Sequence, residues 1–173
     1  EFIIVGARPS IGKTAFALSM TLNMIVKKKY RVGFFSLEMS ASSLMERLLT
    51  GHSRVDFSHI RKATLKNSEM SAIIDASGAL YEAELYIQDT PNMKLMELRA
   101  QARRMKLEHD IQVIFIDYIG LIDAEADARI PRHEQISIIS RSLKQLAREL
   151  DLPVVCLCQV GRQADGVEPK LSD

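Results

Sequence analysis

The feature that most constrains the fold is a short apolar run that leads directly into the sequence Ala-Arg-Pro-Ser-Ile-Gly-Lys-Thr. The apolar run covers residues 2–5, the eight-residue sequence covers residues 7–14, and a helical pattern continues from Gly12 to about Lys28. A strand, a loop ending in Gly-Lys-Thr and a helix, in this order, are typical of a loop that holds nucleotide phosphates with its backbone N–H groups. The N-terminus of the helix adds a favourable dipole. The segment therefore predicts that the chain binds a nucleoside triphosphate.

The usual pattern of such a loop begins with glycine, whereas this chain has Ala7 at that position. We expect the preceding Gly6 to supply the backbone freedom that alanine lacks. We expect Lys13 to reach the β- and γ-phosphates of ATP and the Thr14 hydroxyl to ligate Mg²⁺. The candidate nucleotide-binding residues are therefore Ala7, Arg8, Pro9, Ser10, Ile11, Gly12, Lys13, Thr14 and Ala15.

Apolar runs and helical patterns alternate along the rest of the chain. Further strands are predicted over residues 32–37, 85–88, 113–116 and 154–158. Helices are predicted from Ser40 onward, from about Ser68 to Tyr81, through Leu95, Leu98, Ala102 and Met105, and over residues 134–150. Strands that are apolar on both sides and separated by helices are typical of a parallel sheet covered on both faces. The 173 residues, 47% of them hydrophobic, suit one α/β domain with a sizeable core.

Three further polar residues follow predicted strands. Glu38, Asp117 and Gln159 each come directly after an apolar run. Because the carboxyl ends of parallel strands meet at one edge of the sheet, we expect these residues to lie near Lys13 and Thr14.

Each of the three has a chemical interpretation and a plainer one. Asp117 fits a carboxylate that holds Mg²⁺ through water, or else an ordinary turn aspartate. Glu38 is placed to polarise the water that attacks the γ-phosphate, or else it offsets the dipole of the helix after it. Gln159 can sense the γ-phosphate by hydrogen bonding, or else it is a polar residue at a strand end.

Composition bears on the partners and the cellular compartment that we expect for the protein. The net charge of +1 does not indicate a nucleic-acid binder. Each of the basic clusters at residues 27–31, 103–104 and 129–133, taken alone, is better explained as a solvated face. Cys156 and Cys158 would point to the same face of a strand, so we expect two buried thiols in a reducing compartment rather than a disulfide. No run is long and apolar enough to span a membrane, and we expect a cytoplasmic protein without a membrane partner.

Several stretches resemble the ATPase domain of the bacterial replicative DNA helicase DnaB family, in family order over nearly the whole chain. Ala7 is usual in that family. The matching stretches are residues 7–17, 35–40, 89–91, 99–104, 116–118, 139–144 and 171–173. The resemblance implies a RecA-like P-loop NTPase core that works as a homohexameric ring, hydrolysing ATP to move along single-stranded DNA.

The resemblance also implies roles for individual residues. Glu38 would be the catalytic base, Lys13 would offset phosphate charge, and Gln159 would couple hydrolysis to DNA. Thr14 and Asp117 would hold Mg²⁺, and Arg47 would pack on the adenine base. Arg129 and Arg132 are weaker candidates for DNA contact.

The sequence departs from the family at two places and covers only part of it. Residues 119–121 read Ile-Gly-Leu where the family often has Leu-Gln-Leu, which leaves the role of Gly120 open. Residues 160–162 read Val-Gly-Arg where Leu-Ser-Arg is frequent. We expect residues 1–173 to form a single domain truncated at both ends, without the family's primase-binding domain and arginine-finger segment. In the full-length protein, primase and a helicase loader would be partners.

Three other classes of function would use parts of the same sequence pattern. A RecA-type recombinase or a clock-like ATPase would share the same core, but residues 36–40 and 89–91 favour the helicase family. A nucleotide-dependent scaffold that does not hydrolyse ATP would need no catalytic base, and Glu38 argues against it. A small-molecule kinase would need an arginine-rich lid, which the sequence does not show.

Overall fold

The computed structural model describes residues 1–125 and 130–160, and its centre is a five-stranded sheet in which all paired strands run parallel. The strands are β1 (Phe2–Ala7), β2 (Val32–Ser36), β3 (Leu85–Gln88), β4 (Val113–Asp117) and β5 (Val154–Gln159). Their order across the sheet is β1-β5-β4-β2-β3. The four strands that precede the candidate site residues are therefore neighbours, as the sequence predicts.

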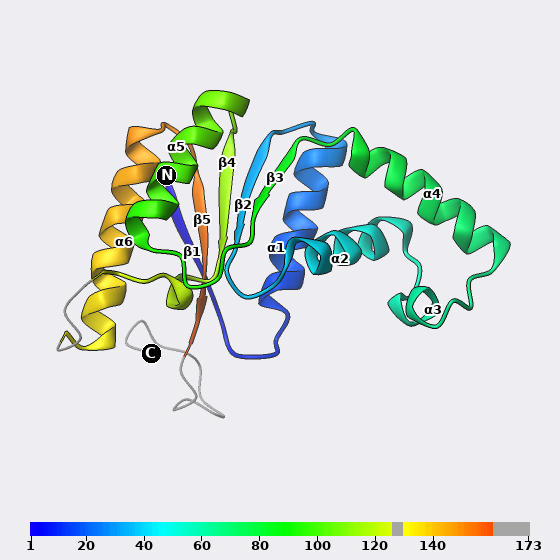
Figure 1. Ribbon diagram of the computed structural model, residues 1–173, viewed down its shortest axis with the longest axis horizontal. Coiled ribbons are helices and arrows are strands. Elements are labelled where there is room, and N and C mark those ends of the chain that lie inside the picture. The colour runs from blue at the N-terminus through cyan, green and yellow to red at the C-terminus, as the bar shows by residue number, and fades with distance from the viewer. Residues whose placement is uncertain (126–129, 161–173) are drawn as a thin grey trace.

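Helices cover both faces of the sheet, which confirms the predicted α/β fold class (Figure 1). One face is covered by α5 (Leu95–His109) and α6 (Arg132–Glu149). The other carries α1 (Lys13–Leu22), α2 (Ala41–Ser53) and α4 (Asn67–Tyr81). Three short elements complete the described chain: a π-helical turn η1 (Asn23–Lys27), helix α3 (Phe57–Arg61) and a 3-10 turn η2 (Ile119–Leu121).

The two faces bury two separate hydrophobic cores because successive side chains of a strand point to opposite sides. Phe34 of β2 stacks on Phe115 of β4 toward α1 and α2, with 5.9 Å between ring centroids. Phe35, Ile114 and Ile116 point to the core under α5 and α6. Every residue of β2 and β4 is buried, as a strand enclosed on both faces requires.

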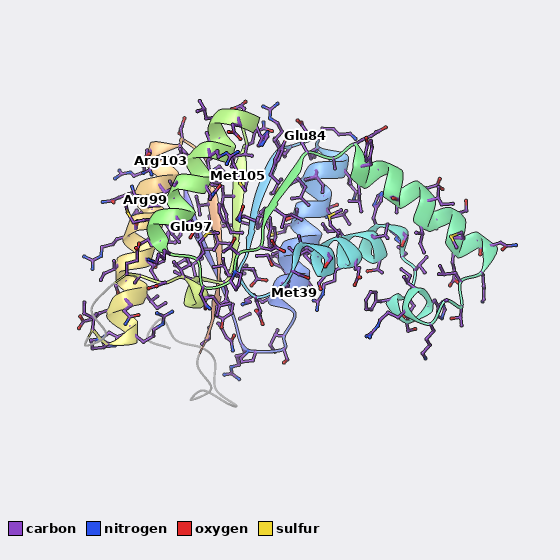
Figure 2. All side chains as sticks on the ribbon, viewed as in Figure 1. Met39, Glu84, Glu97, Arg99, Arg103 and Met105 are labelled. Carbon is purple, nitrogen blue, oxygen red and sulfur yellow. The ribbon has the colours of Figure 1, made fainter. Side chains whose placement is uncertain are left out.

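The helical stripes predicted from spacing largely face these cores. All four predicted positions of α5 are buried, namely Leu95, Leu98, Ala102 and Met105. Across α5 and α6, Arg99 and Arg103 both bind Glu149, and Figure 2 shows the two arginines extending from α5 on the side of α6.

Several boundaries differ from the predicted ones. Helix α4 begins at Asn67 rather than Ser68, because Glu69 closes the first turn by accepting the Lys66 N–H at 2.9 Å. The helix predicted from Gly12 to Lys28 changes to a π-helical turn after Leu22. Helix α3, with five residues, is too short to show a period and was not predicted.

The two cysteines of β5 are free thiols. Cys156 is buried and Cys158 is half-buried against the same core, so the expectation of a buried thiol holds fully only for Cys156. Burial raises the pKa of both thiols, and more strongly for Cys156. Within the described ranges, none of the helices combines the length and the apolar character needed to cross a membrane.

Candidate nucleotide-binding site

The loop after β1 takes the conformation that its glycine allows. Gly12, which immediately precedes α1, has a φ of 100°, and Ser10 has a φ of 62°. A Cβ atom at Gly12 would meet nothing within 4 Å, so the left-handed backbone, and not crowding, favours glycine there.

The expectation that Gly6 compensates for Ala7 is wrong. Ala7 is the last residue of β1 and pairs in register with Gln159, so its extended backbone suits alanine. Gly6 also lies within the strand and outside the left-handed region. The unusual backbone of the loop falls on Ser10 and Gly12 instead.

Lys13, Thr14 and Asp117 meet at the base of the loop. The Thr14 hydroxyl donates to Asp117 Oδ2 at 2.6 Å, and Lys13 Nζ lies 3.1 Å from Asp117 Oδ1. The ion pair lacks the angles of a hydrogen bond, so among the described residues both atoms are buried without a hydrogen-bond partner. Asp117 is 1% exposed. A buried ammonium and a buried carboxylate oxygen with unused hydrogen-bonding capacity are suited to a further polar ligand.

Tyr118 also contacts Lys13, which the sequence analysis missed. The Lys13 ammonium lies 3.8 Å from the centroid of the Tyr118 ring, a cation–π contact. A Cβ atom at Gly120 would come within 2.7 Å of Tyr118 Cε2, so glycine at this position leaves room for the ring. This gives the departure at Gly120 a structural consequence. The only sequence signal was the position of Tyr118 directly after Asp117.

One cavity brings most of the predicted site residues together. It has a volume of about 410 Å³, and Met39, which Figure 2 labels near the start of α2, forms part of its wall. Its lining residues are Arg8, Pro9, Ser10, Gly12, Lys13, Thr14, Ala15, Glu38, Met39, Arg47 and Gln159. Ala7 and Ile11 are outside this set, and Asp117 is connected to it through Lys13 and Thr14.

A second cavity adjoins the first between α1, α2 and α3. Its volume is about 820 Å³, and it shares Ala15, Met39 and Arg47 with the smaller one. Arg47 therefore borders both spaces.

Glu38 lies in the turn between β2 and α2, and its side chain is exposed. The helix cap is Ser40, whose hydroxyl accepts the Ser43 N–H at 3.3 Å. Glu38 thus precedes the capping residue by two positions and is not part of the helix.

Of the two weaker candidates for DNA contact, the structure describes Arg132 but not Arg129. Arg132 donates to the Gly120 carbonyl oxygen and to Gln135, both at 2.6 Å, so its guanidinium ties α6 to the turn after β4. Arg129, Arg162 and residues 171–173 lie outside the described residues.

The residues at the base of the loop fit Mg²⁺. A hydroxyl from Thr14 and a carboxylate from Asp117 are the oxygen donors that this ion prefers. The described part of the chain contains no cluster of three or more His, Cys, Asp or Glu side chains suited to a metal.

The family model of the DnaB-like helicase C-terminal domain matches residues 1–173, the whole chain. The chain belongs to the DnaB-like helicase C-terminal domain family. This confirms the resemblance drawn from the sequence motifs.

Relatives in this family include a protein named replicative DNA helicase DnaB from Treponema pallidum, 51% identical over all of the chain. Another of that name, from Geobacillus stearothermophilus, is 41% identical over all of the chain. The chain spans 39% of the length of each relative.

Two solved structures share the fold. One, described as an ATPase domain, superposes with a TM-score of 0.91 at 32% identity, covering 99% of this chain and 62% of that one. The other, a DnaB-like replicative helicase described with its interactions with primase, gives 0.92 at 32% identity and covers 100% of this chain and 42% of that chain.

Proposed function

We propose that this chain is the ATP-hydrolysing motor domain of a replicative DNA helicase. The observation that carries the proposal is the contact of Lys13, Thr14 and Asp117 at the base of a cavity that Glu38 and Gln159 also line. Membership of the DnaB-like family and the names of its relatives supply the DNA-unwinding part of the proposal.

The loop and the start of α1 would bind the triphosphate of ATP. Backbone N–H groups around Gly12 and the Lys13 ammonium would face the phosphates, and Lys13 would offset the charge of the transferring phosphoryl group. Thr14 and Asp117 would hold Mg²⁺, which neutralises charge on the phosphate oxygens when it is bound. Arg47, at the border of the two cavities, would stack on the adenine base.

Glu38 would accept a proton from the attacking water. It reaches the cavity from the end of β2, at the same edge of the sheet as the phosphate-binding loop. Gln159 would hydrogen-bond the γ-phosphate from the end of β5 and pass its presence to the residues that follow.

The site is open to solvent on the side of Glu38, Arg47 and Gln159, all three of which are exposed. We propose that a neighbouring copy completes the site in a homohexameric ring around single-stranded DNA. Binding would rest mainly on backbone phosphates, which makes it sensitive to salt and tolerant of sequence. Primase and a helicase loader would bind the full-length protein, and the activity belongs in the cytoplasm.

The proposal is tested on the full-length protein by DNA-stimulated ATP hydrolysis and by unwinding of a fork with a 5′ tail. We expect Glu38→Gln to lower kcat by about 100-fold or more, the scale of a lost general base, while the Kd for ATP changes less than about threefold. Glu97→Gln, a matched change of an exposed glutamate on α5 (Figure 2), should leave both values unchanged.

Three results would contradict the proposal in different ways. Strand exchange without unwinding would favour a recombinase. Binding of ATP without turnover in the unmodified protein would favour a scaffold. Normal turnover in the Glu38→Gln variant would remove Glu38 from the role of base.

A further inference from the structure

The turn between β2 and α2 carries Glu38. Across residues 1–125 and 130–160, the Glu38 carboxylate has no hydrogen bond or ion pair with another residue. Its position relative to the cavity therefore depends on what holds the turn.

Three hydrogen bonds hold this turn, one within it and two to other parts of the chain. The Leu37 N–H donates to the Asp117 carbonyl oxygen at 2.9 Å, which ties the turn to β4. The Ser36 hydroxyl donates to the Met39 carbonyl oxygen at 2.6 Å, within the turn itself. The Ala41 N–H, at the first residue of α2, donates to Asp89 Oδ2 at 2.7 Å.

The contact with Asp89 joins elements that are 48 residues apart in sequence. The first N–H groups of a helix have no partner within the helix, and a carboxylate there also suits the helix dipole. Ser40 already caps α2 by accepting the Ser43 N–H, so Asp89 serves a different N–H group. Its contact is an added tie from the end of β3 to the start of α2.

The side chain of Asp89 is exposed, but residues on both sides of it make further contacts. Beside it, the Gln88 side chain donates to Thr90 Oγ1 at 2.7 Å. Four residues on, Met93 is 1% exposed, and its carbonyl oxygen accepts the Asp123 N–H at 3.0 Å. A carboxylate on a segment fixed at both ends can fix the group that it binds.

We propose that Asp89 is a positioning residue for ATP hydrolysis, holding the start of α2 and thereby the turn that carries Glu38. The inference rests on the proposed function. Leu44 and Leu48 bury the middle of α2, so loss of the Asp89 contact would free only its first turn and leave Arg47 in place. Displacing a reacting group by about 1 Å can cost about 100-fold in rate, whereas the phosphate-binding contacts of Lys13 and Thr14 do not involve Asp89.

The test compares variants of the full-length protein in steady-state ATP hydrolysis and equilibrium nucleotide binding. We expect Asp89→Ala to lower kcat by about 10- to 100-fold, with the Kd for ATP changed less than about threefold. Asp89→Asn keeps an oxygen that can accept the Ala41 N–H, so it should restore kcat to within about threefold of the unmodified protein.

A matched control separates positioning from general stability. Asp56 accepts the Ser58 N–H at 2.7 Å at the start of α3, the same kind of contact at another helix. Asp56→Ala should leave kcat unchanged. In addition, Asp89→Ala should cause no further loss of the residual rate in a Glu38→Gln background. Glu38→Gln has already removed the carboxylate that Asp89 is proposed to position.

The positioning role is overturned if Asp89→Ala keeps the kcat of the unmodified protein, or if Asp89→Asn loses as much as Asp89→Ala. The role would also be overturned if adding Asp89→Ala to the Glu38→Gln variant lowered the residual rate by the same factor as Asp89→Ala lowers kcat in the unmodified protein. Failure of the unmodified protein to hydrolyse ATP would instead contradict the proposed function, so the two failures are distinguishable.

Discussion

Asp117 is the residue at which the phosphate-binding loop and the sheet are joined. Its two carboxylate oxygens contact different residues of the same loop, Thr14 through Oδ2 and Lys13 through Oδ1. A buried carboxylate that loses its ion-pair partner is strongly unfavourable. The pair of Lys13 and Asp117 therefore holds the phosphate-binding loop against the end of β4, in addition to any role in binding phosphate.

Removing the Lys13 ammonium should therefore weaken ATP binding. We expect Lys13→Ala to raise the Kd for a non-hydrolysable ATP analogue by about 10- to 100-fold, because a charge-assisted hydrogen bond contributes about 1.5–3 kcal/mol. Isothermal titration calorimetry measures the change. Lys27→Ala, at an exposed lysine outside the cavity, is the control, and equal affinities of both variants would contradict the assignment.

For single residues, the sequence predicts the site residues that follow strands. It misses the residues that contact these parts of the chain from other segments. Glu38 and Gln159 come directly after apolar runs, Lys13 follows another run through the phosphate-binding loop, and parallel pairing brings all three to one cavity. The contacts of Tyr118 with Lys13 and of Asp89 with Ala41 depend on how the chain turns after a strand, which no spacing shows.

Helix α5 shows how a single element divides between core and surface. Leu98 is fully buried, whereas Leu107 on the same helix is 87% exposed. We expect Leu98→Ala to lower the free energy of unfolding by about 2–5 kcal/mol, because it leaves a cavity under the sheet. Leu107→Ala should change it by less than about 0.5 kcal/mol. Urea denaturation measures both, and similar losses would contradict the assigned burial.

Strand β5 carries two thiols whose reactivity the fold suppresses. Burial raises the pKa of Cys156 and Cys158, so the reactive thiolate is scarce at neutral pH and increases only as the pH rises. We expect Cys158, which is half-buried, to be alkylated slowly in the native protein, and Cys156 more slowly still. Mass spectrometry after iodoacetamide treatment, with and without urea, measures this, and equal rates in both conditions would contradict it.

The long helices follow from periodicity and the strands from apolar runs, but the shortest helix and the point at which a helix begins do not. The buried stripe of α5 repeats over about three turns and was predicted in full. In contrast, the five-residue α3 presents no repeat, and the start of α4 is decided by the Glu69 side chain returning to the Lys66 N–H. Such local contacts compete with propensity and are visible only in three dimensions.

At the scale of the whole molecule, the exposed side of the site predicts that turnover depends on assembly. If a neighbouring copy completes the site, the rate per subunit should rise with protein concentration and reach a plateau where the ring forms. Parallel ATPase assays and analytical ultracentrifugation on the full-length protein measure the two curves. A constant rate per subunit across the transition would contradict completion of the site by a neighbour.

The strand order also governs when the site can exist during synthesis. Within the described residues, β1 pairs only with β5, and the two are separated by most of the chain (Figure 1). During synthesis on the ribosome, the Gly-Lys-Thr loop is made long before β5, so β1 lacks its described partner strand until the chain has emerged through Gln159. Contacts between such distant segments form late. We therefore expect the loop to reach its final position only after the other described strands of the sheet have been made.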